Sequence, residues 1–359
     1  MIIYILILIL VIALSLIDSH KLNKVDIFLF IFLIGISGFR YNVGTDFPGY
    51  VYYFNLIDKG LEASVEPGFI FISELILKMG LNIQAVFLVF SILTMFFLYK
   101  GLTYYTNNEY IYKPVLYILM LIYTFFPSLN VIRQILAAVI ILFASRYIIN
   151  RSFIKFAFWV LIASLFHSSS LIFIILYFIA LKNYRRITLI GVLIISLLVV
   201  NGGLLYKALE FIHYNLNFLD VGGYLQKYLE ESSYNNTEIE FGLRFIINLL
   251  VLILFIIFKD LLVRNERTLL IFNFFYLFIL SYVFAIDAYV FSRFTYFFGI
   301  FMAIAVARFG VIFDNNSRRI IEYVILILYS ILYIYIIIYN PAHDIVPYDF
   351  NFDLKVKQY

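Results

Sequence analysis

Long apolar runs follow one another along almost the whole chain, and they constrain its fold more than any other feature. Of its 359 residues, 64% are hydrophobic, and the mean hydropathy is +1.00. A helix needs about 20 apolar residues to cross a bilayer, and fewer where it re-enters or the bilayer thins. Only 13% of the residues are charged, against about 25% in a typical soluble domain. We therefore expect an all-α polytopic membrane protein with a single integral membrane domain over residues 1–359.

The apolar runs divide into about twelve predicted transmembrane helices. Their expected ranges are 1–17, 25–39, 82–99, 113–127, 129–149, 153–166, 168–181, 187–206, 242–258, 268–286, 291–312 and 320–339. The segment 67–79 is shorter and amphipathic, which is typical of a helix that lies in the membrane interface or dips into it and returns. Three segments are expected outside the membrane on one side: residues 40–81, a modest largest loop at 207–241, and the C-terminal tail at 340–359.

Lys and Arg residues in the connecting segments set the predicted orientation. One alternating set of connections holds 16 of the 26 basic residues but only 7 of the 22 acidic residues. In membrane proteins the cytoplasmic loops carry the excess of Lys and Arg. We therefore expect this set to face the cytoplasm and both ends of the chain to lie outside.

The apolar stretch 153–181 decides the orientation of everything that follows it. If it were one span, Lys182, Arg185 and Arg186 would move to the outer side, and the charge asymmetry would weaken. A tight hairpin that breaks at His167–Ser170 keeps the asymmetry and is the prediction. The alternative is one long tilted helix with a buried histidine.

Polar clusters occur at several span ends, and this topology places them all on the outer side. They are Arg40–Asp46, Asn130–Gln134, His167–Ser170, Asp287 with Arg293, and Arg244 where the largest loop ends. Each has a simpler explanation, such as an Arg40 side chain that extends to lipid headgroups or an ion pair between Asp287 and Arg293. Charge is costly at membrane depth and marks functional sites there, so the convergence on one side favours a site.

The residue types in these clusters suit a phosphorylated substrate that reacts with a hydroxyl group. Arginine binds phosphate through bidentate hydrogen bonds and stays charged. A histidine or a carboxylate beside such an anion site can act as general base on the hydroxyl group. The predicted catalytic residues are His167, Asp46 and Arg133, and the predicted diphosphate- or substrate-binding residues are Arg40, Arg133, Arg244, Arg293, Asn130, Gln134 and Asp287. Arg133 and Arg293 are the main diphosphate candidates, and Arg40 and Arg244 are further ones.

Several kinds of chemistry have no support in the sequence. The chain contains no Cys residue, which excludes disulfides and thiolate catalysis. It has neither a GxxxxGK[ST] nor a GxGxxG loop, and its four His residues do not show zinc-site spacing. We therefore expect no cofactor, no metal and no nucleic-acid partner.

Four of these motifs resemble those of one family, the EpsG family of bacterial exopolysaccharide proteins. The run Phe39–Pro48 resembles its R-x-x-V-G-T-D-Y signature, and Asn130–Gln134 with the alanines that follow resembles its R-Q-x-(I/L)-A motif. The run Ile162–Ser169 is similar to its A-x-x-F-H-x-S segment, and Phe291–Phe297 resembles a late R-F-x-x-Y-F element. The motifs occur in the family order over most of the chain.

This resemblance implies a Wzy-type polymerase with a GT-C-like helical architecture in the bacterial cytoplasmic (inner) membrane. Such a protein would join undecaprenyl-diphosphate-linked oligosaccharide units at the outer face by metal-independent glycosyl transfer. Its implied partners are the growing polysaccharide, membrane lipids, a chain-length regulator and a flippase. Two alternatives stay open: an O-antigen-type ligase or single-addition glycosyltransferase, and a lipid-linked oligosaccharide flippase or transporter. The near absence of charge from the middle of the spans disfavours the flippase.

Overall fold

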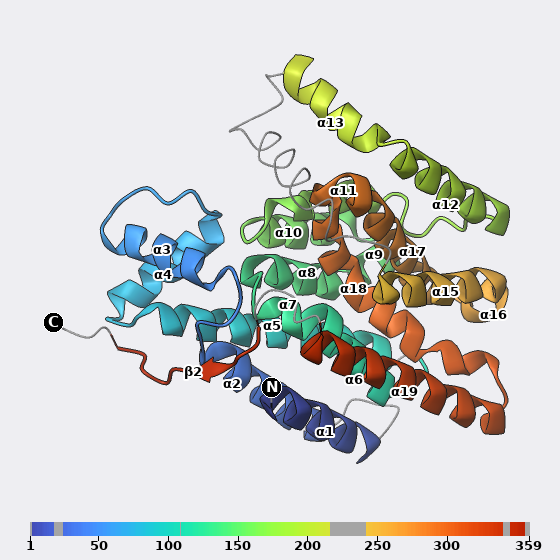
Figure 1. The fold of residues 1–359 in the computed structure, drawn as a ribbon, viewed down its shortest axis with the longest axis horizontal. Coiled ribbons are helices and arrows are strands. Elements are labelled where there is room, and N and C mark those ends of the chain that lie inside the picture. The colour runs from blue at the N-terminus through green and yellow to red at the C-terminus, as the bar shows by residue number, and fades with distance from the viewer. Residues whose placement is uncertain (1, 18–23, 108, 216–241, 340–344, 356–359) are drawn as a thin grey trace. The chain divides into compact units, whose positions relative to one another are not determined.

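The computed structural model in Figure 1 describes residues 2–17, 24–107, 109–215, 242–339 and 345–355. Helices account for most of these ranges, and the two short strands in them pair with each other. The all-α fold class expected from the apolar runs is therefore confirmed. The chain divides into two compact units, Met1–Ile179 with Ala303–Tyr359, and Ala180–Met302.

The first unit combines helices from both ends of the chain. Its helices are α1 (Ile2–Ile17), α2 (Lys24–Gly38), α3 (Phe47–Asp58), α4 (Pro67–Lys78), α5 (Ile83–Thr106), α6 (Lys113–Met120), α7 (Phe126–Ser128), α8 (Ile132–Ala144), α9 (Arg146–Ile149), α10 (Phe153–Ser164), α11 (Ile172–Leu176) and α19 (Asn315–Ile338). A π-helical turn, η1 (Leu121–Phe125), links α6 to α7. Helix α5 packs against α2 and α8, α8 packs against α10, and α6 packs against α1 and α19.

The second unit is built around one long buried helix, α17. Its helices are α12 (Arg186–Asn201), α13 (Leu204–Asn215), α15 (Leu243–Ile257), α16 (Lys259–Leu262), α17 (Glu266–Asp287) and most of α18 (Ser292–Ala307), with a 3-10 turn, η5 (Tyr289–Phe291), before α18. Helices α12, α13 and α15 all pack against α17. Asn265 begins α17 with a capping box, in which its side chain accepts a hydrogen bond from the Thr268 amide.

Five helical segments in the described ranges are long and apolar enough to cross a membrane. They are Ile83–Thr106, Ile132–Ile149, Glu266–Asp287, Tyr289–Ile312, which ends in the 3-10 turn η6 (Phe309–Ile312), and Asn315–Ile338. The bent pair α12 and α13, which meet at 63°, forms a sixth if it is one broken span. Other helices, such as α1 and α15, are apolar but shorter. The chain is thus a multi-pass membrane protein, and the count of twelve spans and the GT-C-like arrangement stay predictions.

The hairpin predicted at His167 is present. The rings of Phe153 and Tyr177 lie 5.1 Å apart, whereas one continuous helix would separate these residues by about 36 Å. The second arm differs from the predicted span 168–181. It contains only a 3-10 turn, η2 (Ser168–Leu171), and the five-residue α11, which together are far too short to cross a bilayer. Serine is a poor helix former because its hydroxyl group can compete for backbone hydrogen bonds, so three serines in a row disfavour a regular helix at Ser168–Ser170.

The segments that are predicted to be external are described in part. Residues 207–215 of the predicted 207–241 loop continue α13, and residues 216–241 lie outside the described residues. The predicted 67–79 helix is α4, which buries one face through Phe69, Ile72 and Ile76. In the tail, β2 (Asp349–Phe350) pairs antiparallel with β1 (Arg40–Tyr41). Figure 1 shows β2 beside α2. Residues 340–344 and 356–359 of the tail lie outside the described residues.

Polar groups of the first unit gather at the two opposite ends of α5. At its N-terminal end, Asn82 caps the helix and donates hydrogen bonds to the tail. At its C-terminal end, Arg146 donates to the Lys100 carbonyl, and Arg308 pairs with Glu109, which follows the helix. A 24-residue helix is about 36 Å long, enough to separate these ends by a bilayer core of about 30 Å.

Candidate functional site

The carboxylate of Glu66 joins two of the predicted site residues. Its Oε1 lies 2.9 Å from Nδ1 of His167, and its Oε2 pairs with the guanidinium of Arg133. The three side chains are largely buried, with 19% of the Glu66 side chain and 22% of the Arg133 side chain exposed. The residue that precedes α4, a residue of α8 and the histidine of the α10–η2 turn therefore form one ionic cluster within the first unit.

The N-terminus of α4 is fixed against the turn that carries His167. The amide of Gly68 donates to the carbonyl of Leu165 at 2.8 Å, and Pro67 sits in the first turn, where a missing N–H costs nothing. A Cβ atom at Gly68 would lie 2.8 Å from that carbonyl and from the Phe166 ring. Glycine thus allows the close approach that brings Glu66, two residues earlier, to His167.

A second connection joins the segment before α3 to the segment before α8. Oδ1 of the buried Asn130 accepts hydrogen bonds from the Asp46 amide at 2.7 Å and from the Thr45 hydroxyl at 3.2 Å. Gly44 has φ +95°, and a Cβ there would lie 2.6 Å from the Leu129 carbonyl, so only glycine fits without strain. Residues Gly44–Asp46 therefore lie against the residues that precede α8, the helix that carries Arg133.

Arg40 is a buried cation that contacts α2 and α5. Its residue exposure is 1%, and one guanidinium nitrogen donates to the Ser37 carbonyl at 2.6 Å. Nε and Nη2 have no hydrogen-bond partner in the described structure. The guanidinium lies 4.3 Å from the centre of the Phe87 ring. Burial lowers the pKa of Arg40 to about 10, which still leaves the group charged at neutral pH.

An aromatic layer lies between the two arginines. The Tyr50 ring is 6.1 Å from the Phe87 ring on which Arg40 packs, and it is 5.6 Å from Cζ of Arg133. Burial raises the pKa of the Tyr50 hydroxyl, so this residue stays neutral. Both cations therefore contact the same aromatic layer, and in the described structure no carboxylate pairs with Arg40.

The structure brings three of the five predicted outer clusters together. Six predicted site residues lie in the first unit: Arg40, Asp46, Asn130, Arg133, Gln134 and His167. Gln134 is buried in the first turn of α8, and Asp46 lies exposed where α3 begins. The other three, Arg244, Asp287 and Arg293, belong to the second unit, and their convergence with Arg133 stays a prediction.

Asp287 has a structural partner of its own. Its Oδ2 accepts a hydrogen bond from the Leu205 amide at 2.8 Å and so caps the start of α13. One oxygen of the Asp287 carboxylate therefore has a structural role at the start of α13. Arg244 packs against the Tyr282 ring, with Cζ 5.7 Å from its centre.

Glu66 was missed by the sequence analysis, although it holds the cluster together. Its segment also contains Glu62 and Glu74, and nothing in the spacing separates the three. The one available signal is that Glu66 precedes Pro67 and Gly68, a pattern that starts a helix at a close backbone contact. Its pairing with His167 depends on the fold.

The arrangement of His167 suits a general base. If Nδ1–H donates to Glu66, Nε2 keeps its lone pair, and it lies 3.3 Å from the Ser169 hydroxyl. A carboxylate that orients an imidazole in this way is the arrangement of hydrolase triads, in which the carboxylate also stabilises the imidazolium that forms. The neighbouring guanidinium groups add positive charge where an anion would bind.

These three joined clusters carry three of the four motifs on which the family resemblance rests. The sequence model of the EpsG family matches residues 23–350, nearly the whole chain. The chain belongs to the EpsG family. Comparison with curated proteins and with solved structures finds no significant match.

Membership of the EpsG family, which is a Wzy-like polymerase family, confirms the resemblance read from the motifs. It points to a polymerase of the glycosyltransferase type that acts in polysaccharide biosynthesis. In this EpsG-family chain, the motif residues that meet are Asp46, Asn130, Arg133 and His167, through the contacts described above.

Proposed function

We propose that this protein polymerises undecaprenyl-diphosphate-linked oligosaccharide repeat units at the outer face of the bacterial cytoplasmic membrane. The observation that carries the proposal is the Glu66 carboxylate, which holds a histidine on one oxygen and an arginine on the other. Such a cluster supplies a base for a sugar hydroxyl and a cation for a diphosphate within a few ångströms. Both are needed by one reaction, glycosyl transfer from a lipid diphosphate.

In the proposed reaction, the growing glycan on its lipid diphosphate is the donor. A hydroxyl group on the non-reducing end of the incoming repeat unit transfers its proton to Nε2 of His167. Its oxygen attacks the anomeric carbon of the donor, and the bond from that carbon to the diphosphate oxygen breaks with its electron pair. The lipid diphosphate leaves as an anion, and direct displacement inverts the anomeric carbon.

Cationic side chains stabilise the leaving diphosphate in this proposal. Arg133 offers five N–H donors, and its pairing with Glu66 uses only part of that capacity. Arg40 is charged, buried and without a carboxylate partner in the described structure, as expected of a group that awaits an anion. Arg293 and Arg244 stay further candidates for binding the diphosphate. Charge-assisted hydrogen bonds of this kind are the largest contribution that a polar site makes to catalysis.

The transfer is proposed to need no metal ion, because guanidinium groups take the charge of the diphosphate. Asn130 fixes the Thr45–Asp46 segment to the start of α8 and so keeps Arg133 in place. Asp46 stays a candidate for the acceptor side, where its exposed carboxylate can accept a hydrogen bond from a sugar hydroxyl group. The charge asymmetry of the loops supports an outward-facing site.

The test is synthesis by the purified protein in lipid nanodiscs with lipid-diphosphate repeat units, a chelator and no nucleotide. We expect a ladder of products from the wild type, no ladder from Arg133→Ala or His167→Ala, and normal insertion of both variants. A single addition would contradict the polymerase and make the protein a ligase. Intact substrate that moves between leaflets of proteoliposomes would make it a flippase.

A further inference from the structure

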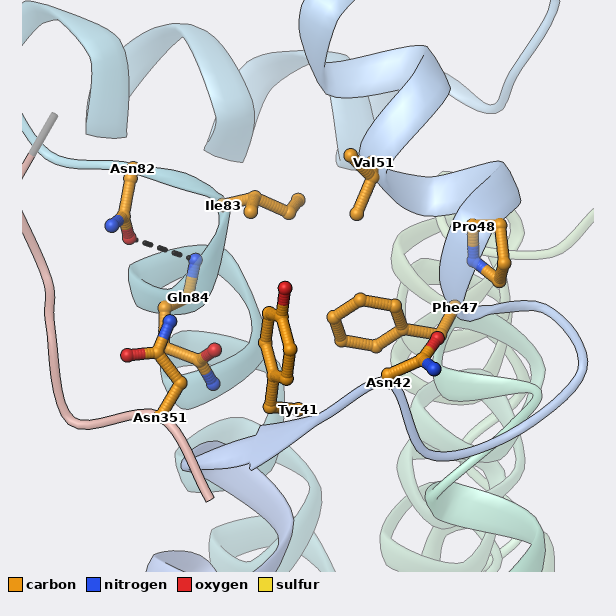
Figure 2. Close-up of a pocket in the computed structure, with 9 residues that line it drawn as sticks. All are labelled: Tyr41, Asn42, Phe47, Pro48, Val51, Asn82, Ile83, Gln84 and Asn351. Atoms are coloured by element: carbon orange, nitrogen blue, oxygen red, sulfur yellow. Dashed lines mark hydrogen bonds between the residues drawn. The ribbon is translucent and has the colours of Figure 1, made fainter. Parts of the chain in front are cut away.

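A pocket separate from the ionic cluster lies where the tail crosses the start of α5. Its volume is about 340 Å³, within the range of about 300–1,000 Å³ that is usual for small-molecule sites. It is formed by β1, the first turns of α3 and α5, and the tail residue Asn351. Figure 2 shows the side chains that line it, with Tyr41 standing in the middle of the group.

One part of the lining is aromatic and aliphatic. The Tyr41 and Phe47 rings meet edge to face at 5.8 Å, and Pro48, Val51 and Ile83 extend the apolar wall. The Tyr41 side chain is half exposed, and its hydroxyl group points toward Ile83 and Val51 in Figure 2. A ligand can thus lay an apolar face on an aromatic ring that is already accessible.

The remaining lining residues all carry amide groups. They are Asn42, Asn82, Gln84 and Asn351. Nε2 of Gln84 donates to the carbonyls of Gly38 and Arg40, which fixes the amide and leaves its Oε1 as an acceptor. Oδ1 of Asn351 accepts from the Asp353 amide, which leaves its Nδ2 as a donor. The pocket therefore offers both donors and acceptors.

The charge of the lining narrows the class of ligand. Among the described residues that line the pocket there is no Asp, Glu, Lys, Arg or His. An anion would find no cation there, and a lipid tail would leave the amides without partners at a cost. Hydroxyl groups donate and accept at once, so a ligand with several hydroxyl groups and an apolar face satisfies both parts of the lining.

An aromatic layer connects the pocket to Arg40 and Arg133. Phe47 stacks on Phe87 at 4.9 Å, and Phe87 carries the Arg40 guanidinium on its ring. The next ring in the layer, Tyr50, contacts Arg133. The pocket and the two arginines proposed to hold a diphosphate, Arg40 and Arg133, therefore contact the same aromatic layer.

From these observations we infer that the pocket binds one uncharged sugar residue of the glycan, with a sugar face on Tyr41 and its hydroxyl groups on Asn42, Gln84 and Asn351. This inference rests on the proposed function, since the sugar that it names is part of the glycan that the protein is proposed to polymerise. It predicts a subsite that recognises neutral sugars and is distinct from the diphosphate site.

The test measures binding of four soluble neutral tetrasaccharides to the full chain in nanodiscs by saturation-transfer NMR. The probes are maltotetraose, cellotetraose, chitotetraose and mannotetraose. We expect at least one to bind, and Tyr41→Ala to weaken that binding about tenfold or more, the equivalent of about 1.4 kcal/mol. Asn42→Gly should weaken it as well, since glycine tolerates the φ of +51° at this position while removing the amide.

Tyr52→Ala is the matched control, because Tyr52 is an exposed tyrosine of α3 that does not line the pocket. Its binding should equal that of the wild type. Absence of binding by all four probes, or equal binding by Tyr41→Ala, would overturn the inference.

Polymerisation assays separate this inference from the proposed function. If the wild type makes polymer and Tyr41→Ala keeps the same KM for the repeat unit, the pocket inference fails and the proposed function stands. If the wild type makes no polymer but binds a tetrasaccharide in a Tyr41-dependent way, the proposed function fails and the pocket inference stands.

Discussion

Nδ1 of His167 lies 2.9 Å from Oε1 of Glu66, a residue 101 positions earlier in the chain. The other oxygen of the same carboxylate pairs with Arg133. One side chain from the segment between α3 and α4 thus orients an imidazole and a guanidinium that come from different helices.

Replacing Glu66 with Gln should abolish most of the polymerase activity. The amide keeps the size of the side chain but cannot pair with Arg133 or stabilise a charged His167. General base catalysis contributes about 10²–10⁴-fold, so we expect a loss of at least about 10²-fold in elongation rate. Gel analysis of the product ladder over time measures it.

Glu62→Gln is the control for that change, because Glu62 is an exposed acid in the same segment. Its elongation rate should match the wild type. Equal rates for Glu66→Gln and the wild type would show that the carboxylate has no part in the reaction.

Gly68→Ala should reduce activity by moving α4 away from the His167 turn. The added Cβ would lie 2.8 Å from the Leu165 carbonyl, so the helix must shift. Misplacement of reacting groups by about 1 Å can cost about 10²-fold in rate. Gly49→Ala on α3 is the matched control, because a Cβ there meets nothing within 4 Å. Comparable elongation rates for the two alanine variants would refute the positioning role of Gly68.

How much of this could be read from the sequence depends on the range of the interactions. Most helices could be predicted from the apolar runs, because the length and composition of a run are local properties that need no knowledge of distant contacts. The hairpin at His167 could be predicted from the basic residues Lys182, Arg185 and Arg186, because only a chain that turns back keeps them on the predicted cytoplasmic side. The role of Glu66 could not be predicted, because it comes from a contact across 101 residues, and two other acids lie in the same segment.

Arg40→Met should stabilise the protein and abolish polymer formation. Arg40 is buried, and two of its nitrogens have no hydrogen-bond partner in the described structure, so its charge opposes folding. Replacing a poorly compensated buried charge by an apolar side chain of similar length is often stabilising by about 1–4 kcal/mol. Thermal unfolding in detergent and the product ladder measure the two effects.

Arg308→Met should change stability in the opposite direction. Arg308 is equally buried but pairs with Glu109 at 3.1 Å, and its loss would leave that carboxylate unpaired at a cost of about 3–5 kcal/mol. A lower unfolding temperature for Arg40→Met than for Arg308→Met would refute the view that Arg40 is kept for binding an anion.

The fully buried pair of Asp26 and Lys113 should behave as one unit. Lys113 Nζ lies 3.1 Å from the Asp26 carboxylate, which also accepts a hydrogen bond from the Tyr117 hydroxyl. Lys113→Met alone should destabilise the protein by about 3–5 kcal/mol, because it leaves a buried carboxylate uncompensated. Adding Asp26→Leu should restore much of the loss. If the double variant unfolds at a still lower temperature, the two residues act independently.

The most direct test of the central claim is a double-mutant cycle on the elongation rate, with Glu66→Gln, His167→Asn and both together in nanodiscs. If Glu66 acts by orienting His167, the double variant should be about as slow as His167→Asn alone, because groups that act as a unit are not additive. Losses in rate that multiply in the double variant would contradict the account and show that the two residues work separately.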